Sequence, residues 1–200
     1  MHPYIAHLSK DKKLKKLIDE QGEIKLRKHT NIPLRLCASI MSQQLSVKVA
    51  EVIYRRFLNL YGKNEPTPED IYNTPNETLR AIGLSNSKVN YVKNVAKFAI
   101  DNGMEEKRLS KMSDDEVIEY LIPIKGVGRW TVEMLLIFTL GREDIFAIDD
   151  LGVQNGMIKH SKLDSTNKKQ FREQMVKKSL KWSPYRSFVC LHFWGWKDRM

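Results

Sequence analysis

Cysteine is scarce in this sequence, with Cys37 and Cys190 as the only two among 200 residues. Two thiols cannot build a disulfide framework. They also cannot supply the four ligands of a structural zinc site or of an iron–sulfur cluster. We therefore expect two reduced, buried cysteines and no iron–sulfur cluster.

Signals for export and for membrane insertion are also missing. Residues 1–13 lack the apolar core of a secretory signal. No stretch approaches the roughly 20 apolar residues that cross a bilayer. We expect no membrane partner. The expected location is the cytoplasm, in association with the nucleoid, or the nucleus if the source organism has one.

Positive charge is what the sequence has in excess. Lys and Arg number 34 against 24 Asp and Glu, which gives a net charge of +10. Cations placed near phosphates release condensed counterions, so this excess suits a nucleic acid or another polyanion. Net charge alone does not identify the partner, because many basic proteins bind no nucleic acid.

Apolar residues recur at helical spacing along most of the chain, and no segment shows the alternation of a strand. Ser113 and Glu116 fit a capping box at the start of one helix. A second helix is predicted from Ser46 to Gly62, with Val49, Ile53, Phe57 and Leu60 on its apolar face. The other predicted helices lie near residues 14–18, 32–41, 77–82, 88–100, 129–140, 167–180 and 185–194. We predict an all-α fold.

Two glycines flank one apolar residue in the segment Lys125-Gly126-Val127-Gly128, between two predicted helices. Glycine permits a tight turn, and the amide groups at the start of the following helix form a natural phosphate seat. Val127 would anchor the turn in the core. An ordinary turn between two helices, capped by glycine, remains the alternative at this point.

Asp149 and Asp150 stand at the start of the next predicted helix. One can cap the helix while the other complements its dipole, which is a structural role. A carboxylate held there can also stabilise an oxocarbenium-like sugar cation or orient an attacking water during glycosidic cleavage. These two residues alone leave both roles open.

The segment Leu121–Thr131 resembles the helix–hairpin–helix element of the base-excision DNA glycosylase superfamily. Three further stretches are similar to its 3-methyladenine DNA glycosylase II (alkylbase glycosylase) branch and follow in the same order: Ile40–Ser46, Ala81–Lys88 and Lys181–Trp194. The resemblance implies two helical lobes with an active-site cleft between them, in the form without the N-terminal β-rich domain. The expected lobes are 32–142, and 1–31 plus 143–200.

The resemblance assigns the catalytic role to Asp150. It implies that Asp149 caps the helix or supports Asp150, and that Arg186 gives support by pairing with Asp149 or with a phosphate. An exchange of roles between the two aspartates stays open. The residues expected to form the base pocket are Trp130, Met134 and Trp194.

Gln43 and Gln44 are expected to enter the stack that a flipped base leaves, or to contact the neighbouring bases. The full set of expected DNA contacts is Gln43, Gln44, Ser46, Lys88, Lys125, Gly126, Val127, Gly128, Arg129 and Thr131. The backbone carbonyls of Ile122, Ile124 and Val127 are a candidate site for a structural monovalent cation. No cofactor is expected to be required.

Relatives that also cut the DNA strand use a lysine two positions after the second hairpin glycine, where this sequence has Trp130. We therefore expect a monofunctional glycosylase without lyase activity. It would be a monomer that binds double-stranded DNA, flips a 3-methyladenine-type base and hydrolyses its N-glycosidic bond in base-excision repair. The sequence departs from the better-known bacterial pattern at Met134, Leu151 and Gln44. These departures concern the range of substrates more than the type of reaction.

Three alternatives are kept: a non-enzymatic helix–hairpin–helix DNA-binding protein, a glycosylase for oxidised or deaminated bases, and an RNA-binding helical protein.

Overall fold

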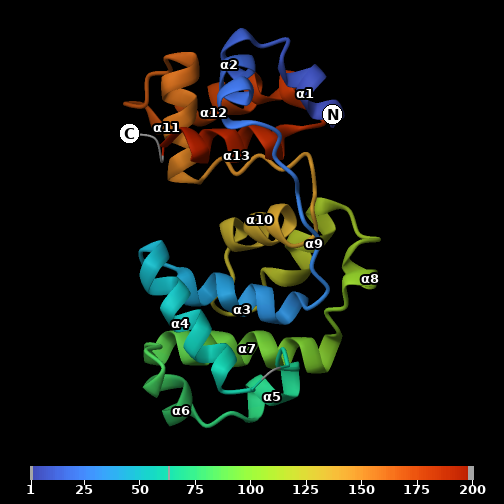
Figure 1. The fold of residues 1–200 in the computed structure, drawn as a ribbon, viewed down its shortest axis with the longest axis vertical. Coiled ribbons are helices and arrows are strands. Elements are labelled where there is room, and N and C mark those ends of the chain that lie inside the picture. The colour runs from blue at the N-terminus through green and yellow to red at the C-terminus, as the bar shows by residue number, and fades with distance from the viewer. Residues whose placement is uncertain (1, 63, 198–200) are drawn as a thin grey trace. The chain divides into compact units, whose positions relative to one another are not determined.

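The computed structural model describes residues 2–62 and 64–197. In those ranges the chain is helical and contains no strand, which confirms the predicted all-α class (Figure 1). The chain divides into two compact units. The central unit spans Lys28–Leu140, and the terminal unit combines Met1–Arg27 with Gly141–Met200.

The central unit is organised around α3, which packs against α4, α7 and α10. Its side chains are buried on several faces, because neighbouring helices cover it from several directions. The helices of this unit are α3 (Ile32–Ser42), α4 (Val47–Asn59), α5 (Pro68–Asn73), α6 (Asn76–Ala81), α7 (Asn86–Asn102), α8 (Glu106–Leu109), α9 (Asp114–Leu121) and α10 (Arg129–Phe138).

Side-chain caps mark where several of these helices begin. Ser113 and Glu116 form the predicted capping box at the start of α9. By contrast, α10 begins at Gly128 without a side-chain cap and without an acidic residue in its first turn. The first amide groups of α10 therefore lack the side-chain acceptor that caps α9.

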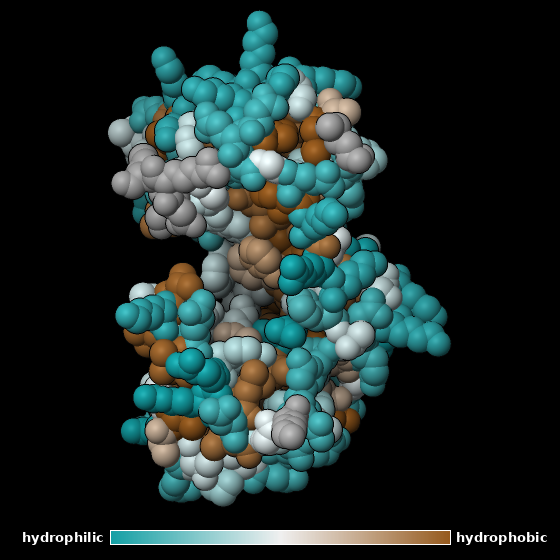
Figure 2. Space-filling model, in the orientation of Figure 1, coloured by the Kyte–Doolittle hydropathy of each residue, from teal (hydrophilic) through white to brown (hydrophobic). Residues whose placement is uncertain are grey.

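The predicted apolar face of α4 is only partly correct. Ile53 and Phe57 are buried, but Val49 and Leu60 are exposed. Val47 and Leu45 are exposed as well, and Figure 2 shows hydrophobic surface beside polar surface at the first turn of α4. This end of the helix projects beyond the residues that pack on its middle.

The terminal unit is built from both ends of the chain around α13, which packs against α11 and α2. Tyr4 stacks on Phe188 in its core, with ring centroids 4.0 Å apart. The elements are α1 (Pro3–Leu8), α2 (Lys12–Gln21), α11 (Leu151–Ser161), α12 (Lys168–Ser179), the 3-10 helix η1 (Leu180–Trp182) and α13 (Arg186–Lys197).

Both cysteines are buried, as predicted, and burial raises the pKa of the Cys37 thiol. Among the described residues, no helix has the length and apolarity that crossing a bilayer requires.

Candidate functional site

Asp150 is the N-cap residue of α11, and its side chain is partly buried. The backbone N–H of Val153 donates to Asp150 Oδ1 at 2.9 Å. The indole N–H of Trp194, from α13, donates to the same oxygen at 2.7 Å. Hydrogen bonds to a charged acceptor are short and directional, so these two donors hold the carboxylate in one orientation.

Gly152 makes the contact between Trp194 and Asp150 possible. A Cβ atom at position 152 would lie 2.6 Å from Cδ1 of Trp194 and 3.0 Å from Oδ1 of Asp150. The absence of a side chain there lets α13 bring the indole against the start of α11. The role of Gly152 was not predicted from the sequence, although a glycine inside a predicted helix costs about 1 kcal/mol relative to alanine and therefore indicates a packing constraint.

Two expected supporting roles differ in the structure. Asp150 itself caps α11, so the expected capping role of Asp149 is wrong. Asp149 is exposed and forms an ion pair with Arg172 of α12. Of the two partners expected for Arg186, Asp149 or a phosphate, Asp149 is wrong, because Arg186 binds Asp144 instead.

The ion pair between Arg186 and Asp144 is bidentate. Nε donates to Oδ1 at 2.7 Å, and Nη2 donates to Oδ2 at 2.9 Å. The hydroxyl of Ser183 donates to Oδ2 as well, at 2.7 Å. Partial burial raises the pKa of Asp144, but the hydrogen bonds from Arg186 and Ser183 outweigh it and hold this pKa below its usual value.

Ser187 attaches the loop before Asp150 to the start of α13. Its hydroxyl donates to the carbonyl of Arg142 at 2.7 Å and accepts from the N–H of Ile145 at 2.9 Å. Closer to the aspartates, the side-chain amide of Gln154 donates to the carbonyl of Ile148 at 3.0 Å. The loop that leads to Asp150 is therefore held to α13 and to α11.

The glycine hairpin of the central unit has a steric requirement at Gly126. Its φ is +103°, and a Cβ atom there would lie 2.2 Å from Cγ of Tyr91. Val127 is buried, as predicted. The side-chain amide of Asn94 donates to the carbonyl of Lys125 at 3.1 Å, which ties the hairpin to α7.

The start of α10 is the exposed side of this hairpin. Lys125, Gly128 and Arg129 are exposed. A Cβ atom at Gly128 would meet no atom within 4 Å, so the amides at the start of α10 are not screened by a side chain there. Uncapped amides and the positive end of the helix dipole favour an anion such as a phosphate. Arg129 also donates to Glu133 at 3.1 Å.

The glutamine pair lies in a tight turn between α3 and α4. Gln44 is exposed, whereas the side-chain amide of Gln43 donates to Thr131 Oγ1 at 3.3 Å. Thr131, which is expected to contact DNA, is buried, and its hydroxyl accepts this bond from Gln43. Ser46 caps α4 by accepting from the N–H of Val49.

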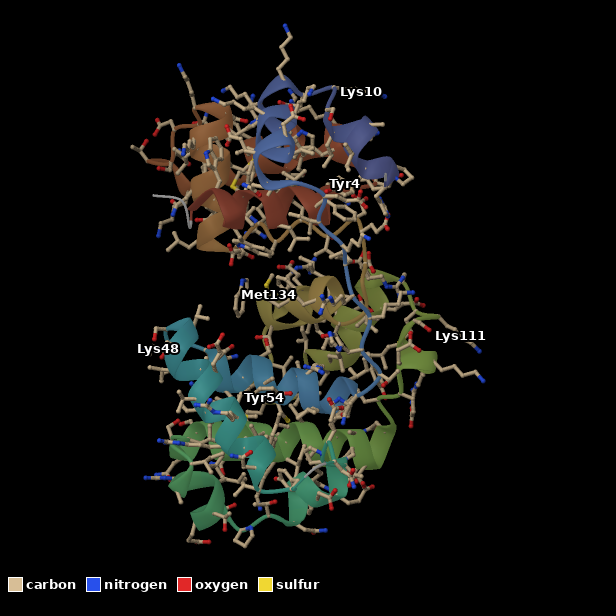
Figure 3. All side chains as sticks on the ribbon, in the orientation of Figure 1. Tyr4, Lys10, Lys48, Tyr54, Lys111 and Met134 are labelled. Carbon is tan, nitrogen blue, oxygen red and sulfur yellow. The ribbon has the colours of Figure 1, made fainter. Side chains whose placement is uncertain are left out.

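The three aromatic and sulfur side chains expected in the base pocket come from two units. Trp130 and Met134 lie one turn apart on α10 of the central unit, where Figure 3 labels Met134. Met134 is 8% exposed. Trp194 belongs to the terminal unit, where it contacts Asp150.

Known proteins resemble this chain over most of its length. "DNA-3-methyladenine glycosylase 1" of Schizosaccharomyces pombe is 37% identical over 161 residues, which cover 80% of this chain and 69% of that protein. The "Alkylbase DNA glycosidase-like protein mag2" of the same yeast is 35% identical, over 94% of this chain and 90% of that protein. The chain spans about half (55%) of the putative DNA-3-methyladenine glycosylase YfjP of Bacillus subtilis, at 31% identity.

Solved structures agree. The 3-methyladenine DNA glycosylase Mag1 of S. pombe, in complex with abasic DNA, matches with a TM-score of 0.85 and 32% identity, over 96% of this chain and 95% of that one. A DNA-3-methyladenine glycosidase of Bacillus halodurans matches with a TM-score of 0.81 and 31% identity, over 97% and 88% of the two chains. The family model for the HhH-GPD superfamily base excision DNA repair proteins matches residues 37–181. The chain belongs to this superfamily.

Proposed function

We propose that this protein is a DNA glycosylase that removes alkylated purines of the 3-methyladenine type from duplex DNA in base-excision repair. The observation that carries the proposal is the carboxylate of Asp150, oriented by Val153 and Trp194 at the start of α11. The named activity of the S. pombe relatives, one of them solved with abasic DNA, supports the same reaction.

DNA binding would begin at the hairpin. The exposed start of α10 offers backbone amides to a phosphate, and Lys125 lies beside it. The net charge of +10 adds a general attraction for the polyanion. A base inside a duplex cannot be reached by an active site, so the damaged nucleotide must be flipped out, and Gln44 is the exposed residue that would probe the gap.

The indole of Trp194, which contacts Asp150 within the terminal unit, would offer an aromatic face to the flipped base. An N-alkylated purine carries positive charge, and aromatic faces attract cations by about 0.5–2 kcal/mol. The charge of the base also makes it a good leaving group, so the site needs no strong general acid.

Asp150 would act on the sugar. The bond between C1′ and the base nitrogen breaks, and its electron pair leaves with the base and neutralises the positive charge. The carboxylate stabilises the oxocarbenium-like sugar. The oxygen of a water molecule oriented by Asp150 then adds to C1′, and this water passes one proton to the Asp150 carboxylate, which returns it to solvent.

Trp130 stands where a strand-cutting relative would have its lysine, so hydrolysis without a lyase step is the expected outcome. We expect the protein to act as a monomer without a required cofactor. The carbonyls of Ile122, Ile124 and Val127 remain candidates for a monovalent cation in the hairpin. The Ile124 carbonyl accepts the N–H of Val127 at 2.9 Å and retains a second lone pair for such an ion.

The test uses two neighbouring aspartates. We expect the wild type to release 3-methyladenine from methylated duplex DNA, as measured by chromatography of the free base. Asp150→Asn should lower the single-turnover rate by about 10²–10³-fold, the cost of removing one electrostatic catalyst. Asparagine is as good an N-cap as aspartate, so α11 should still form. Asp149→Asn is the matched control and should stay within a few-fold of the wild type.

Other results would change the assignment. Full activity of Asp150→Asn with loss in Asp149→Asn would exchange the two roles. Binding of duplex DNA without release of any base from a panel of alkylated, oxidised and deaminated substrates would favour a non-enzymatic DNA-binding protein. Strand cleavage before alkaline treatment would contradict the monofunctional mechanism.

A further inference from the structure

The turn that joins α3 to α4 has an unusual backbone. The N–H of Leu45 donates to the carbonyl of Ser42 at 3.1 Å, which closes a tight turn with Gln43 and Gln44 at its centre. The φ of Gln44 is +58°, in the left-handed region that glycine and asparagine adopt more readily. A residue with an ordinary side chain stays there only when the surroundings hold it.

The ammonium group of Lys88 binds the backbone on both sides of this turn's first residue. Lys88 lies in the first turn of α7, and its Nζ donates to the carbonyl of Met41 at 2.8 Å and to the carbonyl of Gln43 at 2.8 Å. These carbonyls belong to the end of α3 and to the residue that directly precedes Gln44. The side chain of Lys88 therefore binds the carbonyl of the residue before Ser42 and the carbonyl of the residue after it.

The position of Lys88 in α7 would otherwise be unfavourable for a cation. The start of a helix carries the positive end of the helix dipole, which repels an ammonium group. Two carbonyl acceptors compensate for that repulsion. Desolvation lowers the pKa of Lys88, in agreement with an ammonium group drawn toward the protein rather than into solvent.

The same turn is anchored from α10. The side-chain amide of Gln43 binds the buried Thr131, while Gln44 remains exposed. The two glutamines therefore have different surroundings, and the backbone between them is fastened on both sides. Gln44 is the one that points outward from the fastened turn.

We propose that Lys88 is a positioning residue, whose ammonium group holds the Ser42–Leu45 turn in the conformation that presents Gln44 to DNA, in place of the direct DNA contact expected from the sequence. The inference rests on the proposed function, because it concerns the turn through which that function would probe the duplex.

Lys88→Met removes the donors and keeps the length of the side chain. We expect the single-turnover release of 3-methyladenine at saturating protein to fall about tenfold or more, since two charge-assisted hydrogen bonds are lost. A phosphate contact would lower the slope of log K against log salt concentration by about 0.9, whereas a positioning residue leaves that slope unchanged. Lys48→Met, at an exposed lysine in the first turn of α4 (Figure 3), is the matched control and should release the base at the wild-type rate.

A second substitution tests the turn itself. Gln44→Asn keeps an amide side chain and adopts the left-handed conformation more readily. In the Gln44→Asn background, Lys88→Met should slow base release clearly less than in the wild type, because the turn then depends less on the hydrogen bonds from Lys88. Equal losses in both backgrounds, a reduced salt slope for Lys88→Met, or an equal loss in Lys48→Met would overturn the proposal.

A measurement on the unchanged protein covers the case in which Lys88→Met does not fold. The ¹⁵N signal of the Lys88 ammonium should be detectable in the free protein, because hydrogen bonding slows its exchange, and should keep its shift when abasic duplex DNA binds. A signal that appears only with DNA would overturn the proposal. If the wild type releases no base, the proposed function fails. The signal in the free protein still decides whether the Lys88 ammonium group binds the turn.

Discussion

Gly152→Ala should damage the site by adding a single methyl group. The new Cβ would lie 2.6 Å from Cδ1 of Trp194, 3.0 Å from its Nε1 and 3.0 Å from Oδ1 of Asp150. Carbon atoms in contact prefer about 3.5–4.0 Å, so the indole must move by roughly 1 Å. That movement takes the 2.7 Å hydrogen bond from Trp194 to Asp150 beyond bonding distance.

The magnitude follows from the lost bond. A hydrogen bond to a charged group contributes about 1.5–3 kcal/mol, and about 1.4 kcal/mol corresponds to tenfold in rate. We therefore expect Gly152→Ala to slow base release by about ten- to a hundredfold. The same substitution should change the free energy of unfolding by less than it changes the activation free energy of base release. Alanine favours the helix by about 1 kcal/mol, which offsets part of the roughly 1–3 kcal/mol cost of overpacking.

The assay is single-turnover release of 3-methyladenine with protein in excess, beside thermal unfolding of each variant. Gly156→Ala is the matched control, one turn later on α11. Its Cβ would lie 2.4 Å from Cγ of Phe193, so it crowds the core and should lower stability without touching the carboxylate. Trp194→Phe removes the donor and keeps a ring, and should reproduce most of the loss caused by Gly152→Ala.

A folded Gly152→Ala variant that releases base at the wild-type rate would contradict this steric mechanism. A loss of activity in Gly156→Ala as large as that in Gly152→Ala would contradict it as well. Additive losses in the double variant Gly152→Ala/Trp194→Phe would show that the two changes act through different contacts.

Two further predictions concern stability. Asp144→Asn should lower the free energy of unfolding, measured in urea at pH 7, by roughly 1–3 kcal/mol, because the guanidinium of Arg186 loses its bidentate partner. Because the pKa of Asp144 is held low, the difference in stability between the variant and the wild type should shrink as the pH falls below about 4. Burial lowers the pKa of His192 to about 4, against about 6.5 in an unfolded chain, so the wild type should lose roughly 3 kcal/mol of stability between pH 6.5 and 4. His192→Gln should flatten this part of the profile, and an unchanged profile would show that His192 does not titrate as expected.

Helices with a strong periodic pattern could be predicted from the sequence. The apolar spacing over 88–100 corresponds to α7, which spans Asn86–Asn102, and the capping box at Ser113 starts α9. The helices that were missed include α1 and α8, with six and four residues. Elements of that length complete too few turns for a hydrophobic period to be recognised.

Burial on α4 was harder to predict than the helix itself. The spacing of Val49 with Ile53 and Phe57 indicates one apolar face, yet Val49 is 45% exposed and Phe57 is fully buried. Periodicity reports which residues share a face of the helix. It does not report how far the neighbouring helices extend along that face.

Partners of charged side chains were the least predictable part of the candidate site. Asp144 and Asp149 lie five positions apart in one loop, and either could be imagined beside Arg186. The choice depends on where the loop meets the first turn of α13, where Asp144 also accepts the N–H of Arg186 at 3.2 Å. A contact of this kind is set by tertiary packing, so neither residue type nor spacing reveals it.

Residues that act by position are harder to find than residues that act by chemistry. A carboxylate after a hairpin suggests a catalyst, because few side chains can stabilise a sugar cation, but the choice of Asp150 over Asp149 came from the resemblance to the glycosylase superfamily. Gly152 contributes by lacking a side chain, and it matters only because Trp194, far along the chain, approaches the same point. Substitution of Asp150 alone therefore tests the chemistry. The comparison of Gly152→Ala with Gly156→Ala tests the packing that orients the Asp150 carboxylate.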